Sequence, residues 1–274
     1  METIETTMKV PGATLYYEVR GAGPTLLLIP GGPADAGGFE TIAQALADRY
    51  TVVTCDPRGN SRSTFDGPPQ DLRVDLHADD ARRLLAAVSD DPAYVVGHSG
   101  GGVVGLHLAA AHPDAVRTLV VHEPPVVELL PDREAQRAAG QDVYDTYQTQ
   151  GLNAAMQKFM ANAGLDASPN NGHTPPPELA EAMARMAANA EYFVAHGLRA
   201  LTAYEPDMEA LRAGRTRIVV GVGEASPERQ VARRAGEALA ERLGTQPVLF
   251  CGDHDISAHP ARFAETLDRV LQDA

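Results

Sequence analysis

The chain has 274 residues, of which 44% are hydrophobic and 22% charged, and its formal net charge is −14. Its length and hydrophobic fraction suffice for one large α/β unit with an inserted subdomain. The negative charge argues against binding to nucleic acid or to anionic membrane surfaces, because both select basic patches. These features favour an acidic protein of the cytoplasm.

The N-terminal stretch and the cysteines bear on the compartment. Met1–Glu5 lacks the basic start and apolar stretch of a secretion signal, and no run approaches the ~18 apolar residues of a membrane span. Cys55 and Cys251 each lie within or beside an apolar run, which favours buried free thiols over a disulfide framework. Neither cysteine has metal-ligand spacing, and we expect no cofactor.

The first half of the chain alternates buried strands with amphipathic helices. Thr14–Val19 alternates enough for an edge strand, and the continuous apolar run Thr25–Ile29 predicts a strand buried on both faces. Further strands are predicted at Thr51–Cys55, in the run that ends at His98, and at Arg117–His122. The helices predicted between them are Phe39–Tyr50, about Val74–Val88, and the segment that ends at His112. This alternation requires a mostly parallel sheet covered on both faces.

The pattern changes after Glu123. Between residues 126 and 207 there is no long β-branched run, only alanine-rich helical segments at 133–150, 152–163, 178–190 and 191–204, and the loop Asp166–Pro177 predicts an irregular connection. The strand and helix alternation resumes with segments at 216–220, 232–243, 247–251 and 260–271. We therefore predict an α/β core of residues 1–125 and 208–274 and an inserted helical cap of residues 126–207.

Ser99 stands in the sequence Gly97-His98-Ser99-Gly100-Gly101, between a predicted strand and a predicted helix. A serine on such a turn has a strained backbone, and the turn requires small residues two before and two after it. The turn exposes the hydroxyl and directs the N-terminus of the next helix toward it. The pattern favours a nucleophile, while a plain phosphate-binding or packing turn is the alternative interpretation.

The order of these parts resembles the α/β-hydrolase fold over nearly the whole chain. Four local motifs carry the resemblance: the Gly-Gly turn after the early strand, Asp56–Ser63, the serine turn, and Gly252-Asp253-His254. Within that fold the chain is similar to the zearalenone lactone hydrolases in three stretches: His122–Pro125, Gly223–Pro227 and His254–Pro260. The resemblance implies a central parallel sheet, a helical cap and a serine hydrolase.

A serine hydroxyl needs a base to become a nucleophile. His254 is the candidate, because it follows the last predicted strand and keeps the family's chain order of serine, acid and histidine. His98 is expected to pack within the turn. The cluster Asp253, His254, Asp255 and His259 suggests a metal site, but its spacing matches no known ligand pattern.

The acid that orients the histidine departs from the commoner family pattern, in which it follows the strand after the cap. There the chain has Gly223–Pro227, with Ser226 at the expected position of the acid, and a serine cannot supply the charge that stabilises an imidazolium. The resemblance to the zearalenone hydrolases implies Glu123 instead. Glu224 is the alternative acid, and Glu123 then becomes a carboxylate at the entry to the cap.

An oxyanion requires two N–H donors at about 3 Å. Gly100, which follows the serine, is the first candidate, and by resemblance Gly32 is the second. Pro33 has no N–H and is excluded. The alternative is that Pro30–Pro33 is only a turn, and Asp56 and Arg58 are expected to fix loops rather than to contact substrate.

The predicted cap is rich in large apolar side chains at helical spacing, which indicates packing first. Some of them must face the sheet and exclude water from the serine. We expect Met160 and Phe193 among the substrate-binding wall residues. The whole apolar set is Met156, Phe159, Met160, Met183, Met186, Tyr192, Phe193 and Tyr204.

The resemblance implies a cofactor-independent serine hydrolase that cleaves a neutral, largely apolar ester or lactone. Two alternatives remain: a non-hydrolytic small-molecule binder on the same fold, and an aminopeptidase similar to the proline iminopeptidases, which share the Gly-Gly-Pro turn. The expected partner is a small molecule, and a homodimer is one compatible assembly. Dehalogenases and epoxide hydrolases have an aspartate in the turn, so Ser99 argues against both.

Overall fold

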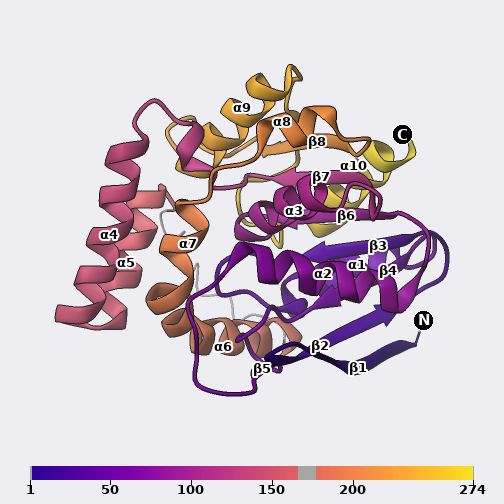
Figure 1. Ribbon diagram of the computed structural model, residues 1–274, viewed down its shortest axis with the longest axis horizontal. Coiled ribbons are helices and arrows are strands. Elements are labelled where there is room, and N and C mark those ends of the chain that lie inside the picture. The colour runs from indigo at the N-terminus through magenta and orange to yellow at the C-terminus, as the bar shows by residue number, and fades with distance from the viewer. Residues whose placement is uncertain (1, 166–176, 274) are drawn as a thin grey trace.

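A nine-stranded sheet organises the part of the chain that the computed structural model describes, residues 2–165 and 177–273 (Figure 1). The strand order is β1-β2-β4-β3-β6-β7-β8-β9, and β5 pairs with β2. The strands from β4 to β9 along this path run parallel, while β1, β2 and β5 pair antiparallel. The strands are β1 (Thr3–Val10), β2 (Ala13–Arg20), β3 (Thr25–Ile29), β4 (Thr51–Cys55), β5 (Thr64–Phe65), β6 (Ala93–His98), β7 (Val116–His122), β8 (Arg217–Gly223) and β9 (Val248–Phe250).

Helices cover both faces of the sheet, because successive residues of each central strand point to opposite sides. Leu26 and Leu28 pack with α1 (Glu40–Leu46) and α10 (Pro260–Gln272) in one apolar cluster. Leu27 and Ile29 belong to a second cluster on the other face. That face is covered by α2 (Val74–Val88), α3 (Gly100–Ala111), α8 (Met208–Ala213) and α9 (Val231–Leu243). The predicted α/β-hydrolase architecture is confirmed.

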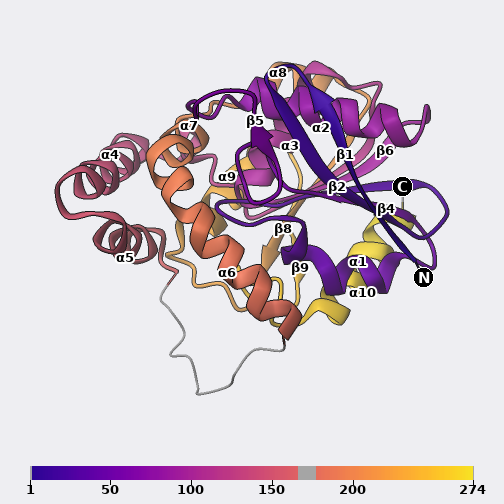
Figure 2. The ribbon, with the colours of Figure 1, turned by 90° about the horizontal axis from the view of Figure 1, so that it is seen from below.

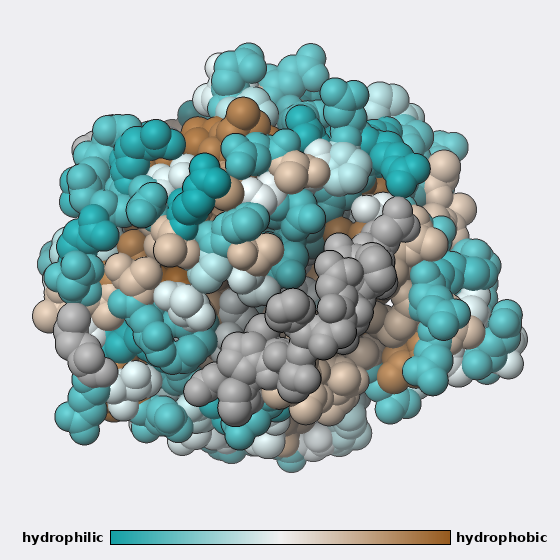
Figure 3. Space-filling view, turned by 180° about the vertical axis from the view of Figure 1, so that it is seen from behind, coloured by the Kyte–Doolittle hydropathy of each residue, from teal (hydrophilic) through white to brown (hydrophobic). Residues whose placement is uncertain are grey.

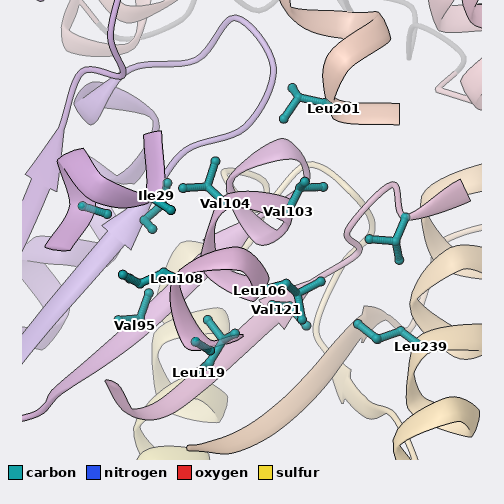
Figure 4. Packing of buried hydrophobic residues seen from close by; sticks show 14 of the residues in the cluster. Ile29, Val95, Val103, Val104, Leu106, Leu108, Leu119, Val121, Leu201 and Leu239 are labelled. Atoms are coloured by element: carbon teal, nitrogen blue, oxygen red, sulfur yellow. The ribbon is translucent and has the colours of Figure 1, made fainter. Parts of the chain in front are cut away.

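The centre of the second cluster is α3, which is apolar on every side and buried along most of its length. Figure 4 shows Val103, Leu106 and Leu108 of α3 packed around the strand residues Val95 and Leu119. A helix with no polar face is stable only when it is enclosed. Its N-terminus, which follows Ser99, is therefore held rigidly at the carboxyl ends of the strands.

Helices between β7 and α8 lie beside the carboxyl ends of the strands (Figures 1 and 2). After the 3-10 turn Val127–Leu129 they are α4 (Arg133–Gln150), α5 (Leu152–Ala163), α6 (Pro177–Tyr192) and α7 (Leu198–Thr202). The helix predicted over residues 191–204 is interrupted by a π-helical turn at Phe193–Gly197. Residues 166–176 of the predicted Asp166–Pro177 loop lie outside the described residues, and Pro177 begins α6.

The N-terminal strand β1 is the main part of the fold that the sequence pattern did not predict, and because it pairs with β2, the prediction of Thr14–Val19 as an edge strand was wrong: β2 lies between β1 and β4. β1 pairs with β2 from Thr3↔Arg20 to Val10↔Ala13, but most of its residues are exposed or half-buried. Polar residues dominate Thr3–Val10, so its apolar alternation is weak. The predicted Phe39–Tyr50 helix is also shorter, because Ala36–Phe39 is a 3-10 turn and α1 ends at Leu46.

The cysteines are free, with Cys55 buried and Cys251 only half-buried.

The face turned away from the viewer in Figure 1 is mainly hydrophilic, with small and separate hydrophobic areas (Figure 3). Among the described helices, none is long and apolar enough to cross a membrane.

Candidate active site

Ser99 lies on a sharp turn between β6 and α3, with φ 50° and ψ −122°. Its N–H donates to the His122 carbonyl at 2.9 Å. Glycine is required on both sides, because a Cβ on Gly97 would lie 2.4 Å from the Gly101 carbonyl oxygen, and one on Gly101 would lie 2.1 Å from that of Ile29. A positive φ in a non-glycine residue is a strained conformation typical of functional sites. The expected strand–turn–helix context of Ser99 is present.

Glu123 and His254 are brought together from strand ends that are 131 residues apart in sequence. His254 Nδ1 donates to Glu123 Oε2 at 2.7 Å. The other carboxylate oxygen, Oε1, accepts from the Gly223 N–H at 2.9 Å. The Glu123 side chain is fully buried, whereas that of His254 is 15% exposed. This bond leaves His254 Nε2 as the ring nitrogen available to a reacting group.

The Glu123 carboxyl is held as a carboxylate. Burial by itself raises its pKa, but the hydrogen bond from His254 and the nearby imidazoles outweigh burial and lower the pKa to about 2. The neighbouring Ser226 hydroxyl adds to the lowering. Ser226, at the position where the commoner family pattern has the acid, thus lies beside Glu123 and is itself buried.

Two further histidines surround this pair. The His98 ring lies 4.7 Å from that of His254 between centroids, and its Nδ1 lies 3.2 Å from His122 Nδ1. Burial is the main cause that lowers the pKa of both His98 and His122, and it lowers that of His122 to about 4. Both rings are therefore neutral near pH 7. His98 therefore packs against the candidate base. Within the described residues His254 hydrogen-bonds Glu123 but not Ser99. Hydrogen bonds between a catalytic base and its nucleophile are often long before substrate binds.

The loop Pro30–Pro33, called the glycine loop below, lies against the serine turn. A Cβ on Gly31 would lie 2.6 Å from the Gly100 nitrogen, so only glycine allows this approach. Gly32 has φ +54°, and its nitrogen lies 3.3 Å from the position of a Cβ on Gly100. The structure thus brings the backbones of both candidate oxyanion donors, Gly32 and Gly100, together beside Ser99.

Helix α6 holds the glycine loop through one side chain, Asn189. Its amide nitrogen donates to the Pro33 carbonyl at 2.8 Å and to Ser61 Oγ at 2.9 Å, and its Oδ1 accepts from the Ser61 N–H at 2.8 Å. On the same helix, Arg185 forms an ion pair with the buried Asp35. The segment predicted to be a cap is therefore bonded directly to the loop that carries Gly32.

A cavity of about 50 Å³ lies beside these backbones, and Gly32 and Gly100 are part of its lining. Phe193 and Leu201 line it from the helical segment. Figure 4 shows Leu201 above Val103 and Val104 at the start of α3. The cavity therefore has the serine turn and the glycine loop on one side and helical apolar side chains on another.

The predicted wall residues have different positions. Phe193 is 5% exposed and lies beside Gly32, whereas Met160 is half-buried on α5 and does not belong to the described lining of this cavity. Their binding roles stay predictions. Met183 and Met186, expected to pack, are 43% and 40% exposed, because the face of α6 that carries them points away from the core.

The motif Asp56–Ser63 supplies ion pairs, and the pair of Arg58 with Asp80 is buried on both sides. Asp56 accepts two hydrogen bonds at 2.8 Å from the Arg62 guanidinium, and Arg58 pairs with Asp80 on α2. These contacts fix loops, as expected, although Asp56 and Arg58 also contribute to the cavity lining. Within the described ranges, no three or more His, Cys, Asp or Glu side chains form a group that could hold a metal ion.

The fold, the strand–turn–helix serine and the paired carboxylate and imidazole agree with a comparison to known families. The sequence model of the alpha/beta hydrolase fold matches residues 24–162. The chain belongs to the α/β-hydrolase fold family. The resemblance noted from the four local motifs is thereby confirmed at the level of the family.

Individual relatives agree with this assignment. This α/β hydrolase is 36% identical over 273 residues to YraK, an uncharacterized hydrolase of Bacillus subtilis (strain 168), and the match covers 97% of this chain and 95% of the relative. The chain is thus a hydrolase, as predicted.

Solved structures show the same fold. A thermophilic esterase from Thermogutta terrifontis matches with a TM-score of 0.74 at 20% identity and covers 100% of this chain and 99% of its own. An enol-lactonase from Burkholderia xenovorans LB400 matches with a TM-score of 0.72 at 18% identity, over 97% and 100% of the two chains. At these identities the likeness establishes the shared fold alone.

Proposed function

We propose that this α/β hydrolase cleaves a neutral, largely apolar carboxylic ester or lactone through an acyl-enzyme on Ser99, without a cofactor. The observation that carries the proposal is the 2.7 Å bond between His254 Nδ1 and Glu123, close to the strained turn of Ser99. A buried carboxylate that fixes one imidazole nitrogen leaves the other free to accept a proton.

In the proposed reaction His254 Nε2 takes the proton of the Ser99 hydroxyl as its oxygen attacks the carbonyl carbon. The C–O bond to the alcohol then breaks, and His254 returns the proton to the leaving oxygen. Water, activated by the same nitrogen, hydrolyses the acyl-enzyme. Glu123 stays ionised throughout, which agrees with a pKa of about 2, and stabilises the imidazolium formed in each step.

The N–H groups of Gly32 and Gly100 are the proposed oxyanion donors. Their approach beside Ser99 and the position of Gly100 at the start of α3 support this role, because unpaired N–H groups at a helix N-terminus favour negative charge. Loss of one such donor typically costs about 3 kcal/mol of transition-state stabilisation.

A lactone is the finer part of the proposal and rests on the resemblance to the zearalenone lactone hydrolases in His122–Pro125 and His254–Pro260. The glutamate that follows β7 and the serine at 226 are the features that agree with it. The net charge of −14 does not attract anionic substrates, which supports a neutral small molecule as the partner, in a cytoplasmic setting.

Labelling and acid release test the proposal together. A fluorophosphonate should label Ser99, and a pH-stat should record acid release from aryl esters, aliphatic lactones or a resorcylic macrolactone. Activity confined to peptides with a free N-terminus would instead support the aminopeptidase. Absence of labelling and of turnover in the folded protein would support the non-hydrolytic binder.

A further inference from the structure

The cavity beside the glycine loop extends to a buried histidine that the proposed mechanism does not use. Its lining includes Gly32 and Gly100 and also His77, Arg58 and Asp80. His77 lies in the first turns of α2 and is 8% exposed. One lining thus joins the candidate oxyanion donors to a set of buried polar side chains.

His77 lacks the partner that a buried polar group normally has. Its Nε2 is fully buried and has no hydrogen-bond partner among the described residues. Leaving such a group unpaired costs about 1–3 kcal/mol, and exceptions in native proteins call for a bound water, an ion or a ligand. Because His77 also belongs to the lining, a ligand in the cavity is a candidate partner for its ring.

The groups around His77 define the charge of that ligand. Arg58 donates two hydrogen bonds to Asp80, at 2.9 and 2.7 Å, and a third to the Pro11 carbonyl at 2.9 Å. The cation and the anion therefore balance each other. Burial, helped by the charge of Arg58, lowers the pKa of His77 to about 4, so near pH 7 the ring is neutral, with one donor and one acceptor nitrogen.

The position of the proposed base indicates which part of the substrate enters. His254 must reach the leaving alcohol, and neither His254 nor Ser99 belongs to the described lining of the cavity. Gly32 and Gly100, which would hold the carbonyl oxygen, both belong to that lining. The acyl group is therefore the part that points into the cavity.

Given the proposed function, on which this inference rests, we propose that the cavity is an acyl subsite in which His77 hydrogen-bonds a neutral polar group of the acyl chain. A ketone or a hydroxyl oxygen fits a neutral imidazole, whereas a carboxylate meets no unpaired cation among the described residues of the lining. One water needs about 10–15 Å³, so a cavity of about 50 Å³ takes a short chain with a few heavy atoms.

Matched 4-nitrophenyl esters test the subsite. The two members of each pair have the same number of heavy atoms, and a methyl group in one replaces the ketone oxygen of the other: 4-oxopentanoate against 4-methylpentanoate, and 5-oxohexanoate against 5-methylhexanoate. In one pair the wild type should prefer the oxo ester about 5- to 150-fold in kcat/KM, the range that corresponds to a buried hydrogen bond of about 1–3 kcal/mol.

Variants assign this preference to His77. His77→Leu should bring the ratio of oxo to methyl ester close to one. His77→Gln, which keeps a donor and an acceptor, should retain part of the ratio. His112→Leu, the same kind of change at the C-terminal end of α3, should leave the ratio unchanged, and thermal denaturation verifies that each variant is folded.

Equal rates for both members of every pair in the wild type would overturn the subsite. An unchanged ratio in His77→Leu would overturn it as well. In either case the proposed function stands, because the methyl esters are hydrolysed. Absence of hydrolysis with every ester would contradict the proposed function itself, and the subsite with it.

Discussion

Three residues other than glycine have positive φ angles among the described positions: Ser61 at 48°, Ser99 at 50° and Glu123 at 48°. Each such residue is costly unless the surrounding structure fixes it. Ser99 is fixed by two flanking glycines, Glu123 by bonds to β8 and His254, and Ser61 by Asn189. Local strain thus gathers around the candidate site.

Ser99→Ala should leave a folded protein whose kcat for any ester substrate is lower by at least about 10³-fold. The hydroxyl contributes little to packing, so thermal stability should stay close to that of the wild type. Ser89→Ala, at the C-terminal end of α2, is the control and should keep full activity. Near-wild-type turnover by Ser99→Ala would remove Ser99 from the mechanism.

The two candidate acids can be separated by amide substitutions. Glu123→Gln should lower kcat by about 10²- to 10⁴-fold with little change in KM, because the imidazolium loses its stabilising charge. Glu224→Gln should have a mild effect, since its own carboxyl does not hydrogen-bond His254. The opposite order of the two variants would place the acid in the turn after β8.

At the scale of elements, the function depends on how α6 and the glycine loop are joined. Backbone N–H groups can stabilise an oxyanion only when they are fixed before the reaction, and an error of about 1 Å can cost 10²-fold in rate. Asn189 supplies three hydrogen bonds, to the glycine loop and to Ser61. We therefore expect α6 to influence catalysis without contacting the reacting atoms.

Asn189→Ala should lower kcat about 10- to 100-fold and the free energy of unfolding by about 1–3 kcal/mol. Met186→Ala on the same helix removes an exposed side chain and should change neither quantity appreciably. Measuring kcat and KM separately distinguishes loss of oxyanion stabilisation from loss of substrate binding. An unchanged kcat in Asn189→Ala would show that the glycine loop holds its position without α6.

At the scale of the whole molecule, buried neutral histidines make stability depend on pH. The pKa values of His77 and His122 are lowered from 6.5 to about 4, mainly by burial, and that of His98 is also lowered. Between pH 6.5 and about 4 the unfolded chain binds more protons than the folded one. Stability is therefore fully present above pH 6.5 and is lost as the pH falls toward 4.

A single such histidine contributes roughly 3 kcal/mol to this loss, from a shift of about 2.5 pH units. His122→Leu should therefore show a smaller fall in the urea midpoint between pH 7 and pH 4 than the wild type. His259→Leu, which removes an exposed histidine, should follow the wild-type curve. Parallel curves for His122→Leu and the wild type would mean that folding does not lower the pKa of His122.

The sequence by itself determined the parts of this protein that depend on local pattern. Continuous apolar runs such as Thr25–Ile29 predicted the buried strands, and the glycines around Ser99 predicted a strand–turn–helix, because burial and tight turns restrict which residues fit. Where the pattern was weak, as in Thr3–Val10 or the π-helical turn Phe193–Gly197, the prediction missed the element or its break.

Contacts between distant residues were decided by the tertiary structure. Glu123 was a candidate acid by resemblance. It can bond His254, which is 131 residues away in the sequence, because β7 and β9 lie on either side of β8 and end at the same edge of the sheet. No periodicity marked Asn189 as the partner of the glycine loop or His77 as a cavity residue. Both lie on ordinary helices, and a side chain's partner across the fold leaves no signal in its own neighbourhood of the sequence.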